Sequence, residues 1–325
     1  MTIDEVILSR QINMNNGWNK EVPCVETEAL MRFKERIGNG QILYPMVIDE
    51  EKAFLSLQKD KHLAKIFSSV LDVYDTLPYH PDLAFDAAWR SLEYLLKYYA
   101  KKAWGSLADS RLDSLFPRFS NEVFASLIKS EQCLQNSFSM LVENVSLSAL
   151  KYMTVRMYFC KELSVAPQIR FVRERAVSIL GKDMFDAFLK EYTDCSGTLD
   201  TLGVRNIARR FWRLLCGDDA TVGTQTFKPI SLEDRIELLL SVVLYSSRCE
   251  RFHGDIYSPL KSSKTRLSTY YEYYYLTLSS LFFFWVQMYK LIDREDVLGQ
   301  FIDVKSIESS VVNTINQMKT ILKSE

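Results

Sequence analysis

Histidine is rare in this chain, and its cysteines are not paired. The 325 residues include 3 His and 6 Cys, and no two cysteines have the Cys-x-x-Cys spacing. Zinc modules usually take four Cys or His ligands from closely spaced motifs, so no metal site is expected. A disulfide-stapled secreted domain is not expected either, because the chain is large and its cysteines lie mostly in apolar periodic segments.

Glycine and proline are also scarce, with 11 Gly and 8 Pro, while aromatic residues make up 13% of the chain. This composition argues against a disordered chain and against a turn-rich all-β protein. The 40 Lys and Arg nearly balance the 41 Asp and Glu, for a formal net charge of −1. A globally basic nucleic-acid binder is thereby excluded, whereas a local basic surface is not.

No leader sequence is evident, because the first residues show no basic region followed by an apolar core. We therefore expect a cytoplasmic protein. The uncharged stretch Tyr273–Tyr289 is at the short end of what a membrane span requires, and it contains Thr277, Ser279 and Ser280. A buried central helix, or a helix at a subunit interface, fits this stretch better than a membrane span.

Apolar residues recur at helical spacing from about residue 50 onward. Residues 1–55 are less regular, with a turn signal at Gly38-Asn39-Gly40 and an apolar run, Ile42–Tyr44, that is compatible with a strand. We predict an all-α protein with an irregular N-terminal extension over residues 1–55 and one helical domain over 56–325. Helices are expected over 49–76, around 85–96, over 119–143, 147–163, 167–193 and 200–216, from Leu232, and over 264–292 and 294–322.

The helix from Leu232 has a clear start and an unusual end. Ser231, followed three residues later by Asp234, fits a capping box. Leu240 and Leu244 lie one turn apart in an ideal helix, and Arg248 is next on that line, so we expect its guanidinium at a partly buried surface.

Common nucleotide and metalloprotease motifs are absent, since the chain has no GxxxxGK[ST], GxGxxG or HExxH pattern; no cofactor is predicted. The residues with chemical potential lie near His253, which is followed by Gly254, a plausible residue just beyond a helix end. A histidine at that end can act as a general acid or base near neutral pH. The planar guanidinium of Arg248 can bind a phosphate. Together they suit phosphodiester cleavage without a metal.

This segment resembles the HEPN superfamily signature, in which Arg-x4-His closes a helix, here with Phe252 before the His and Gly254 after it. The segment Phe85–Lys97 also resembles the early helix of such domains. The resemblance implies a dimerising helical bundle with extra helices. Many members are metal-independent ribonucleases of toxin–antitoxin, abortive-infection and CRISPR-linked defence systems. It implies that Arg248 and His253 form the catalytic pair.

Two positions depart from the family pattern. Cys249 follows the arginine where Asn, Asp or His is common, and Asp255 stands where a toxin subgroup has tyrosine, which here comes at Tyr257.

Four further residues are candidates for supporting this pair. Arg251 could add a phosphate contact or belong to a solvated face, together with Glu250. Tyr257 could hydrogen-bond a phosphate, orient His253 or simply pack in a loop. Glu93, on the less apolar side of its helix, could pair with Arg248.

A basic stripe lies elsewhere, on an otherwise apolar helix that also carries Trp212. It is formed by Arg205, Arg209 and Arg213, at helical spacing, with Arg210 alongside. The stripe could hold an RNA backbone, or it could be a solvated face.

The sequence therefore predicts a metal-independent endoribonuclease that cleaves RNA by 2′-OH attack, in an anti-phage defence or toxin–antitoxin setting. Its expected partners are RNA, a second copy of the chain and a regulatory or antitoxin protein. A non-catalytic helical interaction module and a nucleotide-binding sensor are the alternatives.

Overall fold

The computed structural model describes residues 27–105, 111–158, 167–192, 201–252, 260, 265–293 and 301–322. It is 82% helical with one short hairpin, so the predicted all-α class is confirmed. The chain divides into two compact units, one formed by Met1–Ala108 with Glu250–Glu325 and the other by Asp109–Cys249. The domain expected over residues 56–325 spans parts of both units. Local patterns do not reveal that the two ends of a chain pack together.

The first unit joins the N-terminal and C-terminal helices. Its helices are α2 (Glu28–Ile37), α3 (Glu50–Lys59), α4 (Lys61–Thr76), α5 (Pro81–Trp104), α15 (Leu267–Asp293) and α16 (Val304–Leu322). Two of these helices, α2 and α3, lie wholly or partly within residues 1–55, where an irregular extension had been expected. Each begins at a side-chain cap, because Thr27 accepts the amide of Leu30 and Asp49 accepts that of Lys52.

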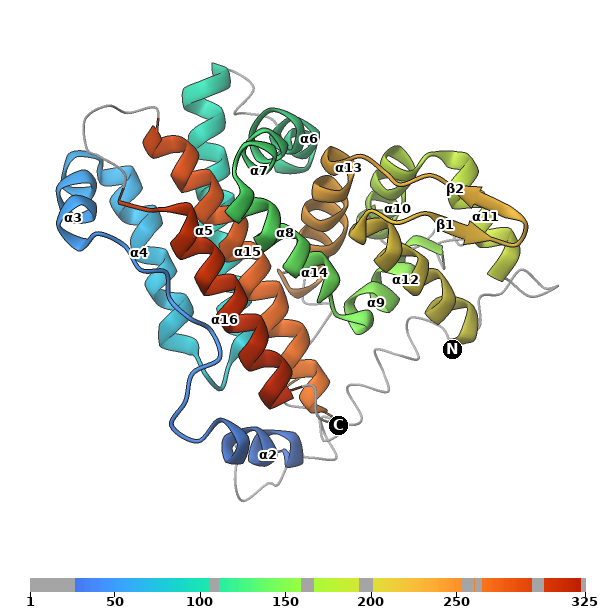
Figure 1. Ribbon diagram of the computed structural model, residues 1–325, viewed down its shortest axis with the longest axis horizontal. Helices are drawn as coiled ribbons and strands as arrows, with labels where there is room; N and C mark the ends of the chain where they lie inside the picture. Colours follow the sequence, from blue (N-terminus) through green and yellow to red (C-terminus); the bar gives the residue numbers. More distant parts are fainter. Residues whose placement is uncertain are drawn as a thin grey trace. The chain divides into compact units, whose positions relative to one another are not determined.

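Helix α15 is the core of this unit. It packs along both α5 and α16, and α4 covers another side of α5 (Figure 1). Residues 273–288 are all buried, as expected for the uncharged stretch read as a central helix. Phe33 of α2 stacks on Tyr270 with ring centroids 4.5 Å apart. No helix in the described part of the chain combines the length and the apolar character that crossing a membrane demands.

The segment after α2 forms no strand, although the apolar run Ile42–Tyr44 was compatible with one. The amide and the carbonyl of Tyr44 pair with side chains of α16 instead of with a neighbouring strand. The amide of Tyr44 donates to Thr314 Oγ1 at 3.1 Å, and Ser310 Oγ donates to the carbonyl of Tyr44 at 2.6 Å. These two bonds fix the segment against the C-terminal helix.

The second unit contains shorter helices and the hairpin. Its elements are α6 (Leu112–Arg118), η2 (Phe119–Phe124), α7 (Ala125–Ser130), α8 (Gln132–Glu143), α9 (Leu147–Tyr158), α10 (Pro167–Leu180), α11 (Lys182–Tyr192), α12 (Thr201–Cys216), β1 (Ala220–Val222), β2 (Gln225–Phe227), α13 (Leu232–Glu237), η3 (Leu238–Leu244) and α14 (Tyr245–Phe252), which ends just past the unit boundary. Helix α12 packs on α8, α9 and α11. The antiparallel hairpin β1–β2, which the sequence did not suggest, turns at Gly223 with φ 55°.

Several helices expected to be continuous are interrupted. The stretch 49–76 breaks at Asp60, whose carboxylate caps α4 by accepting the amides of His62 and Leu63. The stretch 167–193 breaks at Gly181, which has a positive φ of 79° that favours glycine. The stretch 119–143 breaks at Glu131, which is extended between α7 and α8.

The helix from Leu232 begins as predicted, because Ser231 Oγ accepts the amide of Asp234 at 3.1 Å. Its middle, however, is the π-helical segment η3. There the amide of Tyr245 donates to the carbonyl of Leu240, five residues earlier. The turn that starts at Leu240 therefore ends at Tyr245 and not at Leu244. As a result, Leu240, Leu244 and Arg248 do not follow one another along one side of the helix, as the sequence had led us to expect.

Candidate functional site

The second unit brings together ionisable side chains that are far apart in the sequence. Four elements meet there: α6, α10, α13 and the continuous η3–α14 helix. We call this group the Arg175 cluster; its members are Asp113, Arg175, Glu237, Tyr245, Ser246 and Cys249.

Arg175 holds the cluster together from α10. Its Nη2 donates to Ser246 Oγ at 3.2 Å, and its Nη1 lies 3.9 Å from Asp113 Oδ2. Its guanidinium carbon lies 5.1 Å from the centroid of the Tyr245 ring, a cation–π contact. Burial lowers the pKa of Arg175, while the nearby Tyr245, Cys249 and Asp113 oppose that effect. The group stays a cation at neutral pH, so it fixes the near end of α14 to α10.

Glu237 supplies a carboxyl group that titrates near neutrality. Burial, reinforced by the charge of Asp234, raises its pKa from 4.5 to about 7, and the charge of Arg175 only partly offsets this. A carboxyl group with such a pKa can take up or release a proton at physiological pH. Groups of this kind concentrate at functional sites, although structural networks also contain them.

Tyr245 and Cys249 are partners one turn apart on α14. Burial raises the pKa of Tyr245, and the neighbouring Cys249, Asp113 and a hydrogen bond with the Cys249 side chain add to the effect. The cysteine that departs from the family pattern is therefore part of a packed polar contact. The raised pKa of Tyr245 means that the tyrosine keeps its proton at neutral pH.

Arg248 lies on α14, three residues after Tyr245. It is half-buried and its Nε is buried, in keeping with the partly buried surface expected for it. Glu250 and Arg251 continue the same helix, and only their backbone is described. His253 and Tyr257 lie outside the described residues, so the spatial relation of the expected catalytic pair is not part of the structure.

Glu93 belongs to α5 in the first unit. Its carboxylate accepts the indole N–H of Trp89 at 3.3 Å and pairs with Lys97 at 2.8 Å. These contacts lie within one helix and account for its orientation there.

The predicted basic stripe lies on α12, with its apolar side buried and its arginines on the other. Arg205 and Arg209 are exposed. Arg210 donates to the hydroxyl of Tyr192 at 3.3 Å, and Arg213 lies 4.0 Å from Asp218. The stripe therefore contains two arginines that reach into solvent and two that contact neighbouring side chains.

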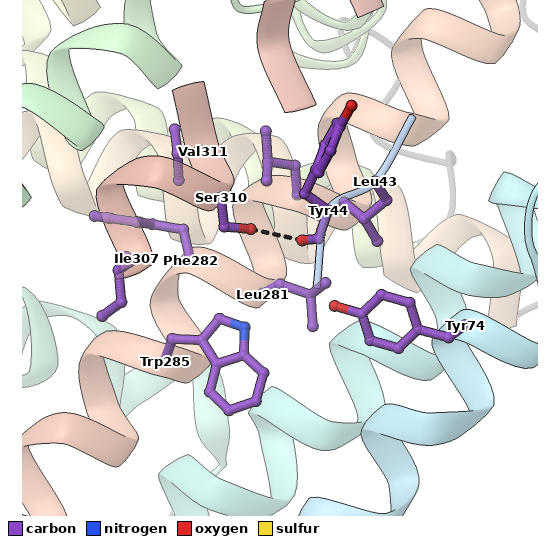
Figure 2. A pocket seen from close by; sticks show the side chains of 10 residues that line it. Leu43, Tyr44, Tyr74, Leu281, Phe282, Trp285, Ile307, Ser310 and Val311 are labelled. Carbon is purple, nitrogen blue, oxygen red and sulfur yellow. Dashed lines mark hydrogen bonds between the residues drawn. The ribbon is translucent and has the colours of Figure 1, made fainter. Parts of the chain in front are cut away.

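A small cavity lies within the first unit, between the 41–49 segment, α4, α15 and α16 (Figure 2). The Tyr74 ring and the Trp285 indole border it, and burial raises the pKa of Tyr74. Its volume is about 10 Å³, about the space that one water molecule needs. It is too small for an organic ligand.

The Arg175 cluster was missed by the sequence analysis, because Asp113, Arg175 and Glu237 lie on separate helices and share no motif. Among the described residues, no three His, Cys, Asp or Glu side chains gather as they would around a metal ion. The only local signal for the cluster in the sequence was Glu237, a charged residue that directly precedes the apolar run Leu238–Leu240. Neither a protein-family model, nor a curated protein, nor a solved structure was found to match this chain.

Proposed function

We propose that this chain is a metal-independent endoribonuclease in which Arg248 and His253 act on the scissile phosphate. The proposal follows the resemblance of the Arg248–Gly254 segment to the HEPN signature. It places the protein in a defence or toxin–antitoxin setting, as a cytoplasmic homodimer whose activity a partner protein can restrain.

The observation that carries the proposal is the environment of Arg248. Its helix is fixed to α10 by the contacts of Arg175 with Tyr245 and Ser246. Its own Nε is buried, so its guanidinium is partly withdrawn from water, where an interaction with phosphate is strengthened. Glu237, with a pKa of about 7, belongs to the same arrangement of helices. Such a setting supports chemistry on an anionic substrate.

The proposed reaction is an internal transesterification. The 2′-oxygen of one nucleotide attacks the adjacent phosphorus, and its proton passes to a base. The bond from phosphorus to the 5′-oxygen breaks, and that oxygen receives a proton. His253 serves as the general acid or base, and Arg248 stabilises the extra negative charge of the phosphorane. The products are a 2′,3′-cyclic phosphate and a 5′-OH end.

The test is a digest of total RNA and tRNA in EDTA, followed by end-group analysis. His253→Ala should lower the cleavage rate by about 10²–10⁴-fold, the usual contribution of general acid–base catalysis. Arg248→Lys should also lower the rate, because lysine lacks the bidentate fork. His62→Ala is the matched control, since His62 is an exposed histidine of α4. Cleavage that needs a divalent metal, or that proceeds on DNA, would contradict the mechanism.

A second candidate function is a non-catalytic interaction module. The packing of Cys249 against Tyr245 within the Arg175 cluster favours it, because that position then serves structure. This function predicts no cleavage by the wild type and an unchanged dimer, by sedimentation, in the double variant Arg248→Ala/His253→Ala. Loss of cleavage in the variants alone would instead support the enzyme.

A further inference from the structure

We propose that the exposed face of α12 binds single-stranded RNA, with Trp212 stacking on an unpaired base and Arg205 and Arg209 contacting neighbouring phosphates. We call this surface the α12 face; it consists of Leu202, Arg205, Arg209 and Trp212. The inference rests on the proposed function for its choice of RNA, and it adds the substrate class and a binding surface apart from Arg248.

The four residues form one strip along the helix. They follow one another at spacings of three, four and three residues, so successive members lie about one turn apart. Leu202 is 61% exposed and Trp212 is 38% exposed. The opposite side of α12 is packed against its own unit, with Ile207, Phe211 and Leu214 buried. Among the described residues, the strip is therefore the side of α12 that is left in contact with solvent.

The charge of the strip is of one sign. Helix α12 contains four arginines and no acidic residue between Thr201 and Cys216. In the part of the chain that the structure describes, Asp218 contacts Arg213, but no acidic side chain pairs with Arg205 or Arg209. With a rise of about 1.5 Å per residue, these two arginines are spaced by about 6 Å along the helix axis. Two adjacent cations of this kind suit a run of phosphates.

Trp212 is held in place instead of swinging freely. Its indole N–H donates to the carbonyl of Glu143, the last residue of α8, at 3.3 Å. The hydrogen bond satisfies the polar end of the side chain and leaves part of the ring surface in solvent. An exposed, fixed aromatic ring beside cations is the usual platform for an unpaired base.

These features favour a single strand over the alternatives. In a duplex the bases are paired and stacked on each other, so Trp212 would contribute nothing. An acidic peptide would use the arginines but has no flat ring system for the indole. A single-stranded nucleic acid uses all three side chains, and its phosphates make the affinity fall with salt; the proposed function makes that strand RNA.

The experiment measures fluorescence anisotropy of labelled 12-nucleotide RNA on the full-length His253→Ala protein in EDTA, across a range of salt concentrations. Trp212→Ala should weaken binding by about tenfold with little change in the salt slope. Arg205→Ala/Arg209→Ala should reduce the slope of log affinity against log salt by about 1.4, because each phosphate contact to a single strand contributes about 0.7. Trp212→Phe should restore most of the affinity, and Arg90→Ala, an exposed arginine of α5, should change nothing. Thermal melts confirm that each variant is folded.

Three results would overturn the inference: no binding of single-stranded RNA, equal binding of duplex RNA that is indifferent to Trp212→Ala, or displacement of the RNA by a poly-glutamate peptide at matched ionic strength, which would indicate a protein partner. The two proposals fail separately. Binding through the α12 face without cleavage by the wild type would contradict only the nuclease, whereas cleavage with unchanged affinity in all α12 variants would contradict only this surface.

Discussion

Glu237 is a carboxyl group whose surroundings keep its proton near neutral pH. Its pKa of about 7 results from burial and from Asp234, with Arg175 opposing both. The folded state therefore binds this proton more tightly than the unfolded chain, where the pKa is 4.5. For this group, the free energy of unfolding is highest at low pH and falls as the pH rises from about 4.5 to 7.

Glu237→Gln should remove that pH dependence. Between pH 5 and pH 8 the wild type should lose about 1 kcal/mol of stability relative to the variant, a figure reduced for solvent screening at a half-buried side chain. Urea unfolding at both pH values measures the difference. Glu233→Gln is the control, because its bond with Lys129 lowers the pKa of Glu233 and it does not titrate in this range. Parallel curves for Glu237→Gln and the wild type would contradict the assignment.

At the scale of elements, the π-helical segment η3 sets the orientation of α14. Its wider turn lets α13 keep Ile236 buried while α14 presents Tyr245 and Ser246 to Arg175. If the same residues formed a regular α-helix, α14 would be rotated by about 100° relative to α13, because each residue of an α-helix turns the chain by about that angle. The segment η3 therefore aligns two faces that a uniform helix could not align together.

Insertion of one alanine after Val242 should break this alignment, because η3 already contains one residue more per turn than a regular helix and a further residue rotates α14 by about 100°. We expect a loss of about 4 kcal/mol or more, because the contacts of Arg175 with Tyr245 and Ser246 are lost together. The control is Val242→Ala, which removes buried methyl groups but keeps the register and should cost about 2 kcal/mol. Urea unfolding compares the two. If the insertion costs no more than the substitution, the register of η3 has no structural importance.

At the scale of the whole molecule, the first unit is closed by contacts between the two ends of the chain. Tyr44 is bound through its amide to Thr314 and through its carbonyl to Ser310. The carbonyl of Phe301 likewise accepts the amide of Asp49 at 3.1 Å. These bonds join residues about 250 or more positions apart, and they form only when the unit is assembled.

Thr314→Val should release the amide of Tyr44, since valine has the same shape but cannot accept the hydrogen bond. We expect a loss of about 1 kcal/mol and a marked drop in hydrogen-exchange protection at Tyr44. Ser310→Ala should cost a similar amount but reduce that protection less, because Thr314 still accepts the amide. The double variant should lose less stability than the sum of the losses in the two single variants, because the first substitution already loosens the segment. Unchanged protection in Thr314→Val would show that this tie does not hold the segment.

Features that depend on neighbours along the chain could be predicted from the amino-acid order. Helical spacing identified the all-α class and the buried stretch of α15, and Ser231 with Asp234 marked the start of α13. The division of α12 into an apolar side and a basic side also follows from spacing alone. The Arg248–His253 motif was visible in the same way, as a local pattern.

How these helices combine became evident from the packing of the folded chain. The break at Asp60 and the π turn of η3 depend on how the flanking helices pack, since capping and register compete with helix continuation at small differences in free energy. The Arg175 cluster unites residues 113, 175 and 237, and no periodicity connects helices that far apart. Burial raises the pKa of Glu237. Burial depends on residues that are distant in the sequence, so it could not be predicted from the residues around Glu237.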